Sequence, residues 1–420
     1  MNPVVSNKSE ENGVLKFTLS GVNLSYANAI RRIILSEIPC IVFKTTPYEQ
    51  NKATIYSNTT RLNNEILKQR LSCIPIHIDD LAFPIEDYIL EVNEKNNTDT
   101  IKIVTSNDFK IKNIKNGKYL SKEAVSKIFP PDPISNSHID FVRLRPKLSD
   151  DIDGEQIHLE CYFSISNARD DGMFNVVSCS SFSNTIDPIA AKQAWDEKEK
   201  QLRSENQTSD DIAFIKKDWY VLEALRFFKP DSFDFIIETI GVFENEEIVK
   251  KASMIMIEKL QTFNKIIQEN GRAYISHIRD TTVPECYDIK LEGEDYTLGK
   301  VVEYILYEYY YLKNKISYCS FRKPHPHISE SYIRISMVSF DANSKSNSNS
   351  SNSNSNSNAG ESRDSRSRSM SGGANNSSDS SDSSGRHDKS SEKVENIITM
   401  INEITLIATD VYDKLVNSFK

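Results

Sequence analysis

The sequence is poor in the residue groupings on which most recognisable functions depend. Its 6 cysteines lie far apart and form no CxxC pair, which excludes a zinc ribbon and a thioredoxin-like redox motif. No run of about 18 apolar residues occurs, so we expect no membrane span. The first residues, MNPVVSNKSEENG, lack the apolar centre of a signal peptide. These absences together predict a protein of a reducing, intracellular compartment.

Positive charge is also scarce. The chain has 51 lysines and arginines against 60 aspartates and glutamates, which gives a formal net charge of −9. Proteins that bind nucleic acid over a wide surface usually carry a basic excess. We therefore expect any contact with nucleic acid to be local or to be made through partner proteins.

The motifs that would identify an enzyme are missing as well. There is no GxxxxGK[ST] loop, GxSxG elbow or HExxH pair. Carboxylate clusters occur at 79–80, 150–153 and 170–171, but they lie in polar, loop-like sequence, whereas a two-metal site needs converging carboxylates. The PHPH sequence at 324–327 has no further Cys or His ligands nearby, which favours a turn with solvated histidines. The sequence thus predicts no catalytic residue, no metal site and no cofactor.

One long segment, residues 341–392, consists almost wholly of serine, asparagine, glycine and charged residues. Such a composition cannot bury enough apolar surface to offset the entropy of the chain, so we predict a disordered insertion. Its SRDSRSRS piece is open to phosphorylation or to contact with RNA, although we favour a passive, expanded loop. The remainder has an ordinary globular composition, and a length of 420 residues indicates roughly two to four domains.

Residues 25–39, SYANAIRRIILSEIP, predict an amphipathic helix with two adjacent arginines. Ser25 is placed to cap its start, and Pro39 ends it. The apolar face holds Tyr26, Ala27, Ile30, Ile33, Ile34 and Ile38. The polar face holds Asn28, Arg31, Arg32 and Ser36, with an exposed Leu35 between the arginines. A solvated helix face would explain the arginine pair, but the leucine shifts the balance toward a partner surface, because arginine is enriched at interfaces.

The hydrophobic pattern divides the chain into two similar units. The first unit has predicted strands at 14–19, 40–50, 157–166 and 232–243 and predicted helices at 25–38, 62–76 and 244–270. The second has a strand at 286–295, a helix at 296–312, strands at 316–327 and 331–340, and a helix at 394–419. Residues 80–154 are strand-like and irregular, with PPDP as a breaker. The whole predicts an α+β protein.

At the first helix the sequence closely resembles a known family. LSGVNLSYANAIRRIILSEIP is similar to the signature of the alpha-like assembly subunits of multisubunit RNA polymerases, which comprise bacterial alpha, the archaeal D subunit and the third-largest subunit of RNA polymerase II. The matching positions are Asn28, Arg31, Arg32 and Pro39. NTTRLNNEILKQRLSCIPI resembles the second element of that family, through Asn58, Glu65, Arg70, Leu71, Ile74 and Pro75.

The second unit resembles the small partner of that subunit, the archaeal L type. GEDYTLGKVVEYIL is similar to its helix entry, through Glu294, Asp295, Thr297, Leu298 and Gly299. SYCSFRKPHPHISESYIRI is similar to its strand–turn–strand, through Tyr318, His325 and Pro326. In cellular polymerases the two proteins are separate and form a heterodimer. The resemblance here implies a fusion, as in large DNA viruses that replicate in the host cytoplasm.

The resemblance implies a domain plan. It consists of two alpha-like dimerisation modules packed as an intramolecular pseudo-dimer, with an insertion domain in the first. The first module would cover residues 12–45 and 155–265, the insertion domain 46–154, the junction 266–285 and the second module 286–420. Many cellular members carry a cysteine-ligated metal in the insertion domain. Residues 80–154 contain no cysteine, so that cluster is absent here.

The resemblance also implies a function: a non-catalytic subunit that holds the two large catalytic subunits of a DNA-directed RNA polymerase. Its partners would be those subunits and the small assembly subunits, with DNA reached only through the complex and no membrane contact. The implied subunit-interface residues are Asn28, Arg31, Arg32, Leu35, Glu65, Arg70, Thr297, Leu298, Gly299, His325 and Pro326. In this view Arg31 and Arg32 meet carboxylates or carbonyls of a large subunit, because a guanidinium binds such groups bidentately.

Two alternatives stay open. One is a nucleic-acid-binding transcription regulator on the same fold that uses the Ser/Arg tract. The other is a carboxylate-metal enzyme, which the missing catalytic constellation disfavours. For a viral protein we expect the replication factory in the host cytoplasm, with the virion as a second location, and for a cellular protein the nucleus.

Overall fold

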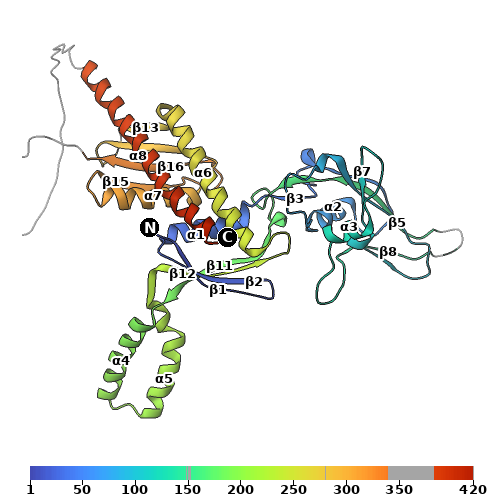
Figure 1. Cartoon of the computed structure of the whole chain (residues 1–420), viewed down its shortest axis with the longest axis horizontal. Helices are drawn as coiled ribbons and strands as arrows, with labels where there is room; N and C mark the ends of the chain where they lie inside the picture. Colours follow the sequence, from blue (N-terminus) through green and yellow to red (C-terminus); the bar gives the residue numbers. More distant parts are fainter. Residues whose placement is uncertain (148, 150–152, 280, 339–382, 420) are drawn as a thin grey trace, which may run out of the picture.

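The computed structural model describes the chain except for residues 148, 150–152, 280, 339–382 and 420. Two halves, a side lobe and a helical hairpin make up the described residues (Figure 1). Within those residues, every helix is too short or too polar to cross a membrane. Most of the predicted disordered insertion lies outside the described residues.

The first half is a four-stranded antiparallel sheet covered by two helices. Its strand order is β1 (Val4–Glu11), β2 (Val14–Ser20), β12 (Phe228–Thr239) and β11 (Val177–Ile186). The helices are α1 (Leu24–Ser36) and α6 (Asn245–Tyr274). The sheet residues Leu15, Phe235 and Ile237 are buried with the apolar face of α1 in one cluster, which places the core between the sheet and the helices.

The second half repeats this plan. Its antiparallel sheet has the order β13 (Ile275–Ile278), β14 (Cys286–Glu292), β16 (Glu330–Met337) and β15 (Ile316–Arg322). The helices are α7 (Tyr296–Leu306), which continues into a π-helical turn at Tyr307–Tyr311, and α8 (Ser383–Ser418). The pairing is the same in both halves. The strand that precedes the short helix, β2 or β14, pairs with the strand that comes last in the chain, β12 or β16. That last strand also pairs with the strand before it in the chain, β11 or β15.

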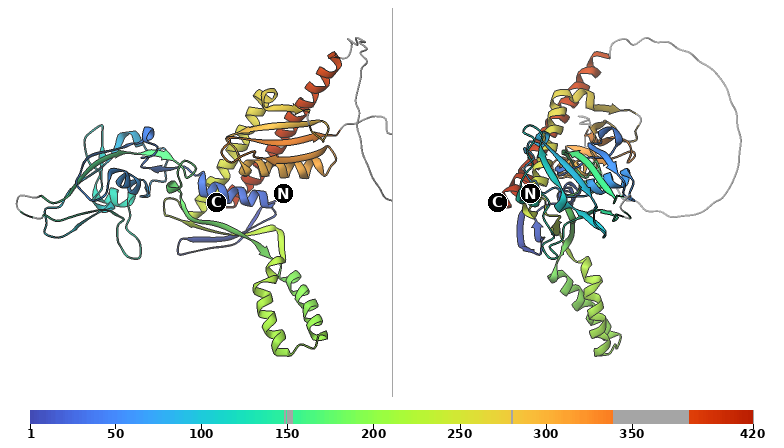
Figure 2. Two further views of the ribbon diagram at one scale, coloured as in Figure 1. Left: turned by 180° about the vertical axis from the view of Figure 1, so that it is seen from behind. Right: turned by 90° about the vertical axis from the view of Figure 1, so that its right-hand side faces the viewer.

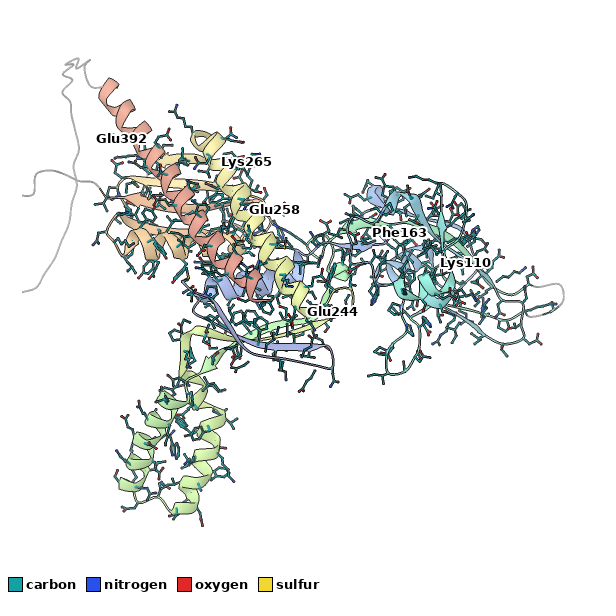
Figure 3. All side chains as sticks on the ribbon, viewed as in Figure 1. Lys110, Phe163, Glu244, Glu258, Lys265 and Glu392 are labelled. Atoms are coloured by element: carbon teal, nitrogen blue, oxygen red, sulfur yellow. The ribbon has the colours of Figure 1, made fainter. Side chains whose placement is uncertain are left out.

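The two halves are packed on each other through their helices. The long helices α6 and α8 lie side by side, and α1 lies against α7 (Figures 1 and 2). Lys265 and Glu258 mark the course of α6 beside α8 in Figure 3. Aromatic rings join the halves at two places: Phe419 meets Phe17 edge-on at 5.1 Å, and Tyr412 lies 5.2 Å from Tyr26. One continuous apolar core therefore contains residues of both halves.

The side lobe, residues 43–163, has its own core. It joins the first half through the short pair β3 (Cys40–Val42) and β10 (Ser164–Ser166). One sheet has the order β4 (Ala53–Asn58), β9 (Gln156–Tyr162), β5 (Tyr88–Lys95) and β7 (Lys110–Asn113). A second sheet pairs β6 (Lys102–Thr105) with β8 (Asp140–Leu144), and the helices are α2 (Asn64–Ser72) and α3 (Lys122–Ile128). The predicted insertion domain, 46–154, lies inside this lobe, and its boundaries stay a prediction.

A helical hairpin between β11 and β12 projects away from the sheet (Figure 1). It consists of α4 (Pro188–Ser204) and α5 (Ser209–Val221), joined by a small core around Trp195 and Trp219. Hydrophobic periodicity predicts no element here. The signals were present, because Asp187 caps α4 with a proline in its first turn and the Thr208 side chain caps α5.

Several predicted elements have different bounds. The strand expected over 40–50 is only Cys40–Val42, and Pro47 cannot donate to a ladder. The helix expected over 62–76 is Asn64–Ser72, because the Asn63 side chain accepts a hydrogen bond from Ile66 N and sets its start. The last helix begins at Ser383, so residues 383–392 are helical rather than disordered. Extension of a helix that is already formed needs far less free energy than nucleation, which explains this difference.

Candidate interface around the first helix

The start of α1 is set by Asn23, whose side-chain oxygen accepts a hydrogen bond from Ser25 N at 2.9 Å. The prediction that Ser25 caps the helix is wrong, because the cap is Asn23, two residues earlier. Asparagine and serine are both favourable N-cap residues, so the residue type alone does not distinguish them. The buried face contains Tyr26, Ala27, Ile30, Ile33 and Ile34, as the apolar pattern predicts. Leu35, expected to be exposed between the arginines, is half-buried and packs against the core.

The two arginines of α1 have different surroundings. Arg31 donates to Asn28 Oδ1 from Nε at 3.1 Å and from Nη2 at 2.9 Å, so it stays on its own helix. Desolvation and the neighbouring positive charge of Arg32 lower its pKa from the ordinary value. Arg31 remains available to a partner, and its role at a subunit interface stays a prediction.

Arg32 instead reaches the second half. Its Nη2 lies 2.6 Å from Asp295 Oδ2, and its Nε donates to Thr297 Oγ1 at 2.8 Å. Asp295 is also the N-cap of α7, because it accepts a hydrogen bond from Thr297 N at 2.8 Å. Burial raises the pKa of Asp295, but the bonds from Thr297 and the charge of Arg32 outweigh burial, so its pKa lies below the usual value. The expected contact of Arg32 with a large subunit stays a prediction, whereas its contact within the chain is direct.

A second ionic contact joins the halves next to α1. Lys259 of α6 lies 2.6 Å from Glu37, at the end of α1, and 2.9 Å from Glu294. Burial raises the pKa of Glu294, and the charge of Lys259 offsets part of that shift. Arg169 donates to the Gly293 carbonyl close by. The turn before α7 is therefore held by cations from three segments of the first half.

Three other predicted interface residues are inside the molecule. Leu298 is fully buried, and Thr297 is almost so. Gly299 lies under Phe321, and a Cβ at this position would come within 2.1 Å of that ring. These residues hold α7 against its sheet and against α1, and their role at an interface with a further subunit stays a prediction.

The remaining predicted interface residues lie in the side lobe and in the turn between β15 and β16. Glu65 is exposed on α2, and Arg70 donates to the carbonyls of Phe141 and Asp140 at 2.7 and 2.6 Å, both within the side lobe. His325 and Pro326 are exposed in the turn between β15 and β16, where His325 Nδ1 accepts a hydrogen bond from His327 N at 3.1 Å. The structure does not bring these four residues together with Arg31 and Arg32.

A groove of about 600 Å³ runs along α1 and α7. Asn28 and Arg32 line it, together with residues that the sequence analysis did not select: Leu24, Tyr296, Tyr304 and Tyr307. Leu24, Tyr296 and Tyr307 are 52%, 46% and 43% exposed. The signal in the sequence was the tyrosine-rich stretch YILYEYYYL, which is more aromatic than a helix core needs.

The fold and this site define a protein built for association through paired helices. Among the described residues, no group of three His, Cys, Asp or Glu side chains is placed to hold a metal ion. The sequence model of the RNA polymerase Rpb3/Rpb11 dimerisation domain matches residues 16–260. The chain therefore belongs to this family of polymerase subunits. Membership agrees with the predicted alpha-like, non-catalytic type of subunit of a DNA-directed RNA polymerase.

Individual relatives agree with this assignment. The DNA-directed RNA polymerases I and III subunit rpac1 of Dictyostelium discoideum is 26% identical over 302 residues, which cover 62% of this chain and 81% of the relative. Subunit Rpo3 of the DNA-directed RNA polymerase of Pyrococcus furiosus is 24% identical over 273 residues, covering 61% and 93%. Human RPAC1 is 39% identical over a shorter stretch of 69 residues, 16% of this chain and 18% of the relative.

Proposed function

We propose that the chain is a fused assembly platform of a DNA-directed RNA polymerase, in which both partners of the usual heterodimer are joined as an intramolecular pseudo-dimer. The observation that carries this proposal is the contact of Arg32 with Asp295 and Thr297, which ties the first helix of one half to the first helix of the other. The repeated strand order of the two sheets supports it. So does the resemblance of residues 286–420 to the small partner.

The proposed partners are the two large polymerase subunits and the small assembly subunits. The groove between α1 and α7 is the surface we assign to a large subunit. Exposed tyrosine side chains next to an arginine are typical of interface centres, where a few such residues supply most of the binding free energy, and Leu24 adds exposed apolar surface beside them. Arg31 lies on the polar face of the same helix and is free to add a charged contact.

The test is co-purification of the large subunits with a tagged chain that carries Leu24→Asp. Leu24 lies in the groove, and its exposure means that the isolated chain should lose less than about 0.5 kcal/mol of stability. At an interface centre the same change is expected to cost about 2 kcal/mol or more, which lowers recovery of the large subunits by more than tenfold.

The matched control is Leu406→Asp on α8, since Leu406 is 62% exposed and does not line the groove. It should fold and co-purify as the wild type does. Arg31→Ala, made in parallel, tests the predicted charged contact separately from Arg32. Wild-type recovery of the large subunits with Leu24→Asp would exclude the groove as their binding surface.

The alternative of a nucleic-acid-binding regulator makes a different prediction. The isolated chain would then bind DNA with an affinity that falls steeply with salt concentration. An assembly platform with a net charge of −9 should show little such binding.

We also propose a viral origin and the replication factory in the host cytoplasm as the location. The fusion of the two modules in one chain supports this, because the resemblance implies separate proteins in cellular polymerases. Immunofluorescence of the tagged chain in producing cells tests it, and a nuclear signal would favour a cellular polymerase instead.

A further inference from the structure

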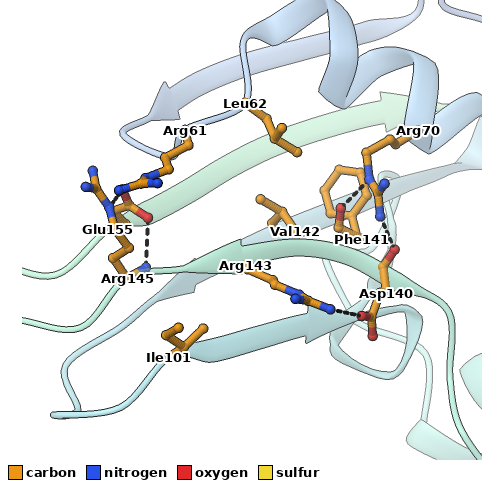
Figure 4. A pocket seen from close by; sticks show the side chains of 10 residues that line it. All are labelled: Arg61, Leu62, Arg70, Ile101, Asp140, Phe141, Val142, Arg143, Arg145 and Glu155. Carbon is orange, nitrogen blue, oxygen red and sulfur yellow. Dashed lines mark hydrogen bonds and ion pairs between the residues drawn. The ribbon is translucent and has the colours of Figure 1, made fainter.

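The side lobe contains a second concave site, far from the groove between α1 and α7. It is a cavity of about 520 Å³ next to the contact of α2 with β8 (Figure 4). Four arginines line it, together with two carboxylates: Arg61, Arg70, Arg143, Arg145, Asp140 and Glu155. The cavity therefore carries an excess of two positive charges, in a chain whose overall charge is negative.

Two of the arginines serve the structure of the lobe. Arg70 donates to two backbone carbonyls of the segment that forms β8. Arg145 is paired with Glu155, which is buried and also accepts a hydrogen bond from the Arg145 backbone at 2.7 Å. These contacts fix the positions of both side chains, so they shape the cavity and contribute charge to it.

The other two arginines are available to a ligand. Among the described residues, Arg143 pairs only with the exposed Asp140, at 3.3 Å, which is a weak surface pair. For Arg61, no hydrogen bond or ion pair with another described residue exists, and it is exposed at the rim of the cavity. A guanidinium holds a carboxylate through two parallel hydrogen bonds, so these two side chains favour an anionic group.

Exposed apolar side chains lie directly beside these cations. Ile103 of β6 pairs in register with Arg143 of β8. Ile101, which directly precedes β6, lines the cavity and is 62% exposed. Leu62 completes this apolar side. The surface therefore places positively charged side chains directly next to branched apolar side chains. A ligand that matches it carries an acidic group next to an apolar group.

A peptide fits this surface better than a nucleic acid. Single-stranded nucleic acids are bound through exposed aromatic rings on which the bases stack. Phe141 is the one aromatic residue among the described residues that line this cavity, and it is fully buried.

We propose that this cavity binds an extended, acidic peptide segment of a partner protein. A carboxylate of the segment lies between Arg61 and Arg143, and a neighbouring branched apolar side chain packs on Ile101 and Leu62. The proposal does not depend on the polymerase role, because it concerns a different surface.

The experiment selects ligands without assuming a partner. The full chain is immobilised and exposed to a phage-displayed library of random dodecapeptides, with counter-selection on the Arg61→Glu/Arg143→Glu variant. The enriched peptides should place Asp or Glu next to Leu, Ile or Val. In fluorescence polarisation they should bind the double variant at least about tenfold more weakly than the wild type. The two new glutamates would repel the carboxylate of the peptide that the two arginines attract.

The matched control is Lys118→Glu/Lys127→Glu, which makes the same change of charge at exposed positions of the lobe outside the cavity. It should bind the peptides as the wild type does, and both variants should retain the wild-type circular dichroism. If the cavity variant unfolds, Arg61→Gln/Arg143→Gln replaces it. Enriched peptides without acidic residues, or an equal loss in the control, would overturn the proposal. Tighter binding of a single-stranded thymidine oligonucleotide, lost in the cavity variant alone, would assign the site to nucleic acid instead.

Discussion

The two halves of the molecule have corresponding positions at the start of their short helices. In the first half the sequence GVN precedes α1, and in the second GED precedes α7. Both segments begin with a glycine at positive φ, Gly21 and Gly293, and both end with the helix cap, Asn23 and Asp295. Each cap accepts a hydrogen bond from the backbone two residues on. The local fold of the helix start is therefore the same.

The halves differ in the charge of that cap. Asp295 is a carboxylate and pairs with Arg32, whereas Asn23 is neutral. The residue that corresponds to Arg32 by its distance from the cap is Tyr304, which meets Tyr26 edge-on at 6.3 Å. One ion pair is thus made where a symmetric dimer would make two. The Arg32–Asp295 ion pair therefore needs an arginine from the first half and an aspartate from the second. Two copies of the same half could not form it, so neither half can replace the other.

The largest expected effect comes from removing the aromatic side chain that the second half places on the sheet of the first. Phe419 is fully buried and packs edge-on against Phe17. Phe419→Ala should lower the free energy of unfolding by about 3 to 5 kcal/mol. Urea unfolding, followed by hydrogen exchange of α1, measures this, and Leu406→Ala on the exposed face of α8 is the control. An unchanged midpoint for Phe419→Ala would mean that the first half is stable without this contact.

A smaller effect is expected where the halves differ by one methyl group. Gly299 in α7 corresponds to Ala27 in α1. Gly299→Ala should cost about 1 to 3 kcal/mol, because the new Cβ would overlap the Phe321 ring. Ala27→Gly should cost about 1 kcal/mol from helix propensity alone. Thermal melting checks both, and Phe321→Leu should restore part of the stability lost in Gly299→Ala. A stabilising Gly299→Ala would contradict the close packing of α7 on β15.

The smallest effect tests the charge difference itself. Asp295→Asn keeps a capping side chain, as in the first half, but removes the ion pair with Arg32. Because both side chains are partly exposed, the loss at neutral pH should be about 1 kcal/mol, and less at high salt.

The pH dependence of that loss follows from the pKa of Asp295, which is lowered on folding. The contribution is complete above the usual carboxyl pKa of about 4 and disappears as pH falls through the lower folded value. Wild type and Asp295→Asn should therefore differ in unfolding free energy at pH 7 and converge in strong acid. A difference that persists in acid would assign the effect to the cap rather than to the charge.

The sequence predicted those features of the fold that repeat locally. The apolar faces of α1 and α7 follow from helical periodicity, and the buried residues Ile30, Ile33, Val301 and Ile305 confirm them. The polar contacts of the site could not be predicted in this way. Arg32 and Asp295 are 263 residues apart, and no local pattern specifies which partner a surface arginine meets.

Two further misses have local causes. Asn23 and Ser25 are both good capping residues, so spacing alone could not decide between them. The hairpin of α4 and α5 was not predicted because its apolar residues are sparse and two tryptophans supply much of its small core. In a segment so rich in charge, the caps at Asp187 and Thr208 are a stronger signal of the two helices than hydrophobic periodicity.

The packing of α8 on α6 has a consequence for synthesis of the chain. The apolar residues of α6, such as Met256 and Leu260, are complete on the ribosome long before Ile401 and Ile404 of α8 are added. At about 5 to 20 residues per second, the intervening stretch takes roughly 7 to 28 s to translate. During that interval the nascent first half exposes a helix face that its own later sequence must cover. The time spent in this open state should make the chain more dependent on chaperones than a domain of the same size whose core closes early.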